Sequence, residues 1–223
     1  MDMSVSKPNL DAMAADTQVG PGSASIFPEV NSAESNYLTN QFLIAMPGML
    51  DEQFAGSVVY LFEHNAKGAM GLVVNRPTDV TLSDLLEKIE LTPEGSAFSE
   101  QAVYFGGPVQ VERGFVLHDS PSPSYSSSLT VPQGLTMTTS KDVLEAVASG
   151  GGPSRFMMTL GYAGWSAGQL EEEIALNGWI NAKLSREQIA EIVFATPASQ
   201  RYQRTMNALG FDPADLSGQV GHA

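Results

Sequence analysis

Residues 160–173 read Leu-Gly-Tyr-Ala-Gly-Trp-Ser-Ala-Gly-Gln-Leu-Glu-Glu-Glu, and this stretch separates an apolar run from a helical pattern. The apolar run that ends at its first residue, 156–160, has the length and character of a strand. The segment that follows, 169–176, is predicted to be a helix. The stretch is therefore a predicted strand-to-helix junction, and Ser166 within it admits two interpretations.

The first interpretation makes Ser166 a nucleophile, because Gly164-Trp165-Ser166-Ala167-Gly168 matches the Gly-x-Ser-x-Gly elbow of hydrolases. The second makes it the N-cap of the next helix, with Gln169 closing a capping box and Trp165 packing as the hydrophobic staple. A serine nucleophile needs a histidine within hydrogen-bond reach, and the only later histidine is His222, beside the C-terminus. We therefore favour the cap and keep a small serine hydrolase as the alternative.

The composition limits the classes of function. Of 223 residues, 25 are acidic and 11 are basic, so a net charge of −14 repels nucleic acids and anionic membranes on average. The chain has no cysteine, which excludes disulfides, thiol nucleophiles and zinc–thiolate sites. The densest basic stretch is diluted by glutamates and is predicted to be a solvated helix face; it comprises Lys183, Arg186, Arg201 and Arg204.

The N-terminal part of the chain differs in character from the rest. Residues 1–34 are rich in Ser, Ala, Pro, Gly and Asn without apolar periodicity, which predicts a disordered extension. Residues 35–223 are predicted to form a single domain. Neither part contains a signal-peptide core or an apolar run that could span a bilayer, so we expect a cytoplasmic protein with no membrane contact.

Within the domain, short apolar runs and capped helical patterns follow one another without a regular alternation, which favours an α+β fold with a largely antiparallel or mixed sheet. The predicted strands are 42–46, 57–62, 70–74, 103–105, 114–118, 129–131, 156–160 and 178–184. Of these, 57–62 and 70–74 should form a hairpin. The predicted N-caps of the helices are Ser83, Ser140, Ser166 and Ser185, and Pro197 is placed in the first turn of the last helix.

The hairpin carries the first candidate polar residues. Glu63-His64 and Asn75-Arg76 hold groups suited to acid–base or anion-binding chemistry, but the hairpin register separates His64 from Asn75 by roughly 20 Å at about 3.3 Å per residue. We therefore expect His64 to be a turn residue bonded to backbone, and Asn75-Arg76-Pro77 to be a strand end. His118 ends another strand, and a metal pair with His64 has too little spacing information to be predicted.

Several ordered motifs together resemble the bacterial YqgE/AlgH family, over a region from about Tyr37 to the last helix. They are 45–51, 63–77, 106–109, 113–118, 160–165 and 168–171. The resemblance implies a compact α+β domain whose sheet curls towards a barrel and is flanked by helices. It implies little chemistry, because the family's regulatory label comes from an association with alginate production and not from a DNA-binding module.

Two classes of function remain open. One is a non-catalytic regulatory or interaction protein that acts on a protein or small-molecule partner, with any link to transcription indirect. The other is the small serine hydrolase. The candidate ligand-binding residues are His64, Asn75, Arg76, His118, Trp165 and Gln169. We expect no cofactor, because the glycines at 161, 164 and 168 do not have the Gly-x-Gly-x-x-Gly spacing, and we expect no metal site and no direct binding to nucleic acid.

Overall fold

A computed structural model describes residues 37–92, 100–119 and 125–211. The predicted N-terminal extension, 1–34, lies outside the described residues. The described strands are β1 (Phe42–Ala45), β2 (Val58–Asn65), β3 (Gly68–Val73), β4 (Pro77–Thr81), β5 (Ala102–Phe105), β6 (Val109–His118), β7 (Ser128–Thr130), β8 (Thr136–Thr138), β9 (Phe156–Ser166) and β10 (Trp179–Ala182). The helices are α1 (Leu82–Lys88), α2 (Asp142–Ala148), α3 (Gln169–Ala175), α4 (Arg186–Ala190), the π-helical turn η2 (Glu191–Ala195) and α5 (Ala198–Ala208).

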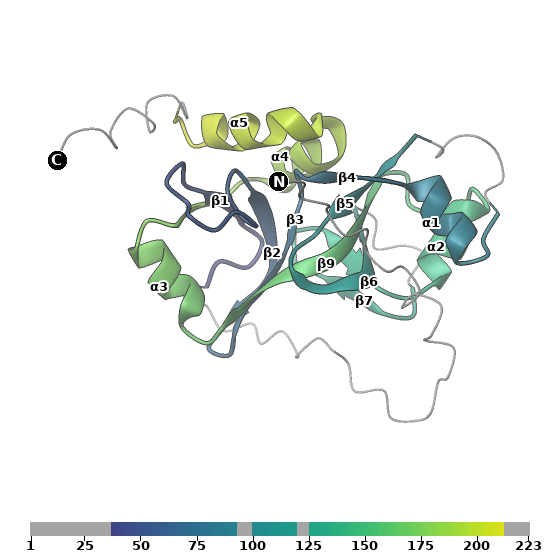
Figure 1. Cartoon of the computed structure of the whole chain (residues 1–223), viewed down its shortest axis with the longest axis horizontal. Helices are drawn as coiled ribbons and strands as arrows, with labels where there is room; N and C mark the ends of the chain where they lie inside the picture. Colours follow the sequence, from purple (N-terminus) through teal and green to yellow (C-terminus); the bar gives the residue numbers. More distant parts are fainter. Residues whose placement is uncertain (1–36, 93–99, 120–124, 212–223) are drawn as a thin grey trace, which may run out of the picture.

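The strands form one curled sheet in the order β10-β1-β2-β3-β9-β6-β8-β7, and every neighbouring pair along this path is antiparallel. β5 adds the parallel element by pairing with β9, and β4 pairs with β5. The chain is thus a single α+β domain with a largely antiparallel half-barrel sheet, as the sequence and the resemblance predicted. The long strand β9 runs through the centre of the molecule (Figure 1).

Helices cover the sheet on three sides. In Figure 1, α4 and α5 lie along the top, α3 lies at the lower left, and α1 and α2 lie together at the right. Each covered surface has its own core: one inside the curl, one beneath α1 and α2, and one beneath α3. Alternation along β1 and β2 explains the first and third, because Phe42 and Tyr60 face into the curl while Leu43 and Val59 face α3.

Three of the four predicted N-caps were wrong. Helix α1 begins two residues before the prediction, with Thr81 instead of Ser83 as N-cap and Asp84 completing the capping box. Ser140 does not cap α2, because the Ser140 hydroxyl donates to Asp142 Oδ1 at 2.5 Å. The N-cap of α2 is Lys141. The third, Ser166, is described with the site below. The Ser185 capping box with Gln188 was confirmed.

The basic stretch also needs a correction at one residue. Arg201 was predicted to be solvated, but it is buried, and its guanidinium donates to the Val74 carbonyl and lies 5.0 Å from the centre of the Tyr104 ring. Burial lowers the pKa of this guanidinium. Its hydrogen bonds join α5 to the end of β3, so a residue that the charge pattern assigned to the surface holds the last helix on the half-barrel.

Candidate functional site

Most of the predicted site residues lie around one surface of the molecule, which we call the α3 face. It consists of α3, the parts of β3, β9 and β10 that α3 packs against, the end of β2 that bonds to α3 through His64, and the β1–β2 loop, 46–57. His64 and Trp165 come from these strands and Gln169 begins the helix, while Asn75 and Arg76 bond to the loop. His118 belongs to β6, in the other part of the sheet.

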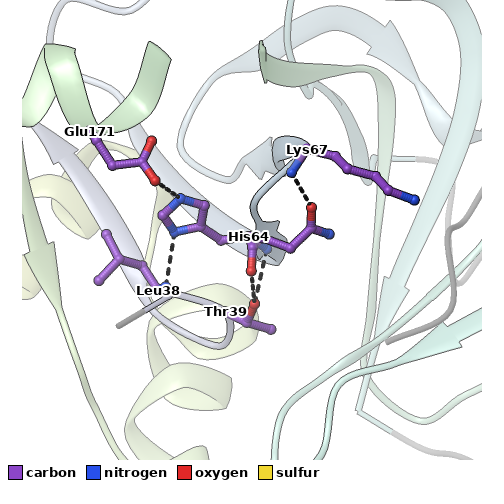
Figure 2. A network of polar contacts seen from close by, with 6 residues as sticks. Leu38, Thr39, His64, Lys67 and Glu171 are labelled. Carbon is purple, nitrogen blue, oxygen red and sulfur yellow. Dashed lines mark hydrogen bonds and ion pairs between the residues drawn. The ribbon is translucent and has the colours of Figure 1, made fainter. Parts of the chain in front are cut away.

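His64 is a buried strand residue, 5% exposed, and both of its ring nitrogens are engaged. Nδ1 accepts a hydrogen bond from the Leu38 backbone N–H at 3.0 Å, so the proton of the neutral ring belongs on Nε2. Nε2 lies 3.0 Å from Glu171 Oε1 on α3 and donates to it (Figure 2). The ring therefore connects the N-terminal segment, the sheet and the helix.

The predicted position of His64 in a turn was wrong, although its predicted bond to backbone was confirmed. Strands β2 and β3 extend further than their apolar runs, and Asn65 pairs with Gly68, so that only Ala66 and Lys67 form the turn. The Asn65 side chain supports the turn by accepting from the Lys67 backbone N–H at 2.7 Å. The β2–β3 register shifts between Leu61 and Glu63, and pairing of β3 with β9 on its other side supports the hairpin as far as Gly68 at its tip.

Ser166 is the last residue of β9 and is not an N-cap. It pairs with Gly68, and α3 begins three residues later behind Gly168, which has a left-handed backbone (φ 79°). The chain needs Gly168 in this conformation to turn from strand into helix, and glycine adopts it without strain. One part of the predicted capping box was confirmed, because Gln169 Oε1 accepts from the Ser166 backbone N–H at 2.9 Å.

Trp165 and Trp179 share one carboxylate. The two indole N–H groups donate to Glu173 Oε2 at 2.9 and 2.7 Å, and Glu173 Oε1 accepts from Gln169 Nε2 at 2.9 Å. Phe54 from the β1–β2 loop packs against both indole rings. Trp165, a candidate ligand-binding residue, is buried in the cluster beneath α3.

Asn75 and Arg76 hold the β1–β2 loop. The Asn75 amide accepts from the Val58 N–H and donates to the Gly56 carbonyl, both at 2.8 Å, at the register that the hairpin predicted. The Arg76 guanidinium donates to the carbonyls of Gln53 and Ala55 at 2.6 Å, and to that of Glu52 at 3.3 Å. These candidate ligand-binding groups are thus directed at the loop backbone.

His118 is buried and its Nε2 lies 2.9 Å from Thr138 Oγ1 of β8. Its ring also meets the Tyr125 ring edge to face. Within residues 37–92, 100–119 and 125–211, no group of three or more His, Asp or Glu side chains is arranged to hold a metal ion. His118 contacts Thr138 and Tyr125, while His64 contacts Leu38 and Glu171, so the two histidines have different surroundings.

Sequence reasoning missed the two glutamates that organise the α3 face. Neither Glu171 nor Glu173 was selected as a candidate site residue, yet Glu171 holds His64 and Glu173 holds two tryptophans. The spacing of Gln169 and Glu173, four residues apart on a helix, was a usable signal for their contact. The long-range partners had no signal in the sequence, because they depend on the sheet register.

The exposed residues of the α3 face have a simple chemistry. Leu50 in the β1–β2 loop is 95% exposed and Leu176, the C-cap of α3, is 81% exposed. Two exposed carboxylates, Asp51 and Glu52, directly follow Leu50, and a third, Glu172, lies four residues before Leu176. This face therefore presents apolar side chains and negative charge on a framework of internal hydrogen bonds.

The half-barrel with three helix-covered surfaces defines the class of protein. A family model described as AlgH-like matches residues 42–214, and the chain belongs to this family. It is 63% identical to the UPF0301 protein RSc0675 of Ralstonia nicotianae over 186 residues, which cover 83% of this chain and 95% of the relative. It is 55% identical to the UPF0301 protein BTH_I1462 of Burkholderia thailandensis over 193 residues, 86% of this chain and 98% of the relative.

The chain is also similar to solved structures. The solution structure of the AlgH protein from Pseudomonas aeruginosa has a TM-score of 0.68 and 44% identity, covering 87% of this chain and all of that one. The crystal structure of protein DIP2367 from Corynebacterium diphtheriae has a TM-score of 0.58 and 21% identity, covering 81% and 89%, and shows a shared fold. Among the described residues, none of the helices has the length and apolar character needed to cross a membrane.

Proposed function

We propose that this AlgH-like protein is a non-catalytic interaction protein that binds a protein partner through its α3 face, and that any effect on transcription is indirect, through that partner. The observation that carries the proposal is that polar side chains of this face form hydrogen bonds within the fold and leave other groups exposed to a partner. His64, Arg76 and Glu173 bond to other parts of the fold, while leucines and carboxylates are exposed. A surface stiffened in this way binds without a large ordering cost.

The surroundings of Ser166 support this choice over the hydrolase. Ser166 ends a strand, and its backbone N–H is bonded to Gln169, in place of the strained elbow that exposes a nucleophile. His64 would have to give up Leu38 or Glu171 before either ring nitrogen could take a proton from a serine.

A photo-crosslinking experiment tests the proposal. Because the chain has no cysteine, a single introduced one can carry a benzophenone at a chosen position. Ala175→Cys places it on the exposed surface of α3, and Val111→Cys places it on β6 as the control. Irradiation in a lysate of the native bacterium should give a discrete protein adduct from the α3 position and not from β6. Equal adducts at both positions, or none at α3, would count against the proposal.

The same preparation tests the alternative. A fluorophosphonate probe should leave the wild-type protein unlabelled if the α3 face is only a binding surface. Covalent labelling that disappears in Ser166→Ala would establish the hydrolase in its place.

A further inference from the structure

Leu50 and Leu176 lie at the same end of the α3 face. β1 and β10 pair with Ala45 opposite Trp179, and the Met46 N–H donates to the Gly178 carbonyl at 2.9 Å. The loop after β1 therefore runs beside the turn that follows α3. These two turns carry the leucines, which are 95% and 81% exposed.

The leucines are surrounded by negative charge. Asp51 and Glu52 directly follow Leu50 in the loop, and Glu172 precedes Leu176 by one helical turn on the same side of α3. Glu171 adds a carboxylate whose side chain is 51% exposed beyond its contact with His64. Arg76 also reaches this loop: its guanidinium donates to the loop carbonyls and interacts electrostatically with Asp51, while the hydrogen bonds described for it leave Glu52 and Glu172 as carboxylates for a partner.

The backbone beneath the leucines is held in place by contacts already described. Arg76 and Asn75 fix the loop from one side, and Phe54 anchors it on the tryptophan pair from the other. The position of Leu50 is therefore set by the fold. Two fixed, exposed leucines with carboxylates around them form a surface for a partner of complementary pattern.

The charge of the surface decides between possible occupants. Residues 1–36 of this chain contain five acidic residues and one basic residue, a net charge of −4, so the N-terminal extension is repelled. A second copy of the chain, at −14, and nucleic acid or anionic lipid are repelled in the same way. A segment with apolar side chains on one side and Lys or Arg on the other complements both features.

We infer that the Leu50–Leu176 end of the α3 face docks a cationic amphipathic segment of another protein, with apolar side chains covering the two leucines and basic side chains meeting Asp51, Glu52 and Glu172. This inference rests on the proposed function and specifies the chemistry of the partner. In the recognition of amphipathic helices, the apolar contacts supply affinity and the charges supply orientation and rate of association.

The test uses the full-length protein and a defined probe, a fluorescein-labelled 14-residue Leu/Lys amphipathic helix, measured by fluorescence anisotropy. The wild-type protein should bind this probe with an affinity that decreases as salt rises, and should not bind the matched Leu/Glu probe. Leu50→Ser combined with Leu176→Ser should weaken binding at least tenfold. Val111→Ser, which alters another exposed apolar residue, should change it less than twofold.

A pair of charge reversals separates the local site from the overall charge. Glu172→Lys on α3 and Glu145→Lys on α2 both change the net charge from −14 to −12, because −1 becomes +1 in each. We expect about a fivefold loss for Glu172→Lys and less than a twofold loss for Glu145→Lys. All five substituted positions are exposed, and near-UV circular dichroism confirms that each variant is folded.

Four outcomes would overturn the inference. Equal losses for the two charge reversals, or none for the double leucine variant, would mean that the probe responds only to net charge. Flotation of the protein with neutral phosphatidylcholine vesicles, lost in the double leucine variant, would assign the leucines to a lipid surface. If Ala175→Cys captures a partner while the Leu/Lys probe fails to bind, the proposed function stands and the inferred partner chemistry is wrong.

Discussion

Trp165 at the end of β9 and Trp179 at the start of β10 donate their indole N–H groups to the same oxygen atom, Glu173 Oε2, with ring centroids 5.8 Å apart. The two strands are separated in the sheet by β1, β2 and β3. One carboxylate on α3 therefore ties together two distant strands, and it satisfies two buried donors at once.

Removing this carboxylate should destabilise the protein. Glu173→Ala leaves two indole N–H groups without their acceptor, at an expected cost of about 2–4 kcal/mol in the free energy of unfolding. Glu173→Gln keeps one oxygen and should cost about half as much. Urea denaturation followed by tryptophan fluorescence measures both, with Glu172→Gln as the neighbouring control, expected to lie within about 0.5 kcal/mol of wild type. Similar stabilities for all three variants would contradict the bridging role.

Arg76 should be required for the order of the β1–β2 loop. Arg76→Met removes three donors to the carbonyls of residues 52, 53 and 55, at a cost of about 2–3 kcal/mol. Arg76→Lys should recover only part of this, because an ammonium group cannot span three carbonyls as the planar fork does. Hydrogen exchange should become faster in residues 51–57 of both variants. Arg204→Lys, at an exposed ion pair with Glu191, serves as the control and should leave the loop unchanged.

Tyr60 should make the free energy of unfolding decrease as the pH rises above 10. Its hydroxyl donates to Asn40 Oδ1 and accepts from the Leu135 N–H, and burial raises the pKa of this phenol from 10.0 to about 12. The folded state therefore keeps a proton that the unfolded state loses. The contribution is fully present below pH 10, and it is lost at about 1.4 kcal/mol per pH unit as the pH rises towards 12.

Tyr60→Phe isolates this contribution. The difference in unfolding free energy between wild type and Tyr60→Phe, from urea titrations at pH 8 to 11, should be constant up to about pH 10 and then decrease. Burial also raises the pKa of Tyr125 and Tyr202, but their titration is common to both proteins and cancels in the difference. A difference that stays constant to pH 11 would show that Tyr60 titrates normally.

The spacing of apolar residues and the positions of turn-forming residues predicted most strands and helices of this fold. Leu82, Leu85, Leu86 and Ile89 recur at helical spacing and are all buried, and the hairpin register placed Asn75 correctly. The short strands β4 and β8 were missed, because β4 contains Pro77 and polar residues, and β8 contains only Thr136, Met137 and Thr138. Both are recognisable as strands only through their pairing partners.

The site was predicted less well than the fold, for a physical reason. His64, Trp165 and Gln169 were selected by residue type, and their partners are set by contacts between segments far apart in the chain: His64 meets Glu171 across 107 positions. The resemblance supplied the curled sheet but no side-chain contacts. The error at Ser140 has a local cause, since a serine hydroxyl near a helix start has competing partners that only the folded chain selects, here Asp142.

Ser166 and Ser185 provide the last prediction, because they were assigned the same role and only one of them has it. The Ser185 hydroxyl accepts from the Gln188 N–H at 3.3 Å and the Gln188 side chain bonds back, so Ser185→Ala should cost about 1 kcal/mol and Ser185→Gly only a few tenths. At the other helix the cap is Gly168, and Ser166 contributes only its backbone N–H to Gln169.

Ser166→Ala should therefore change the free energy of unfolding by less than about 0.5 kcal/mol. Gln169→Ala should cost more than Ser166→Ala, since it removes the bonds to both Ser166 and Glu173. Thermal and urea denaturation of these variants beside Ser185→Ala make the comparison within one protein. A cost for Ser166→Ala equal to that of Ser185→Ala would restore the serine cap and require α3 to begin two residues earlier in solution.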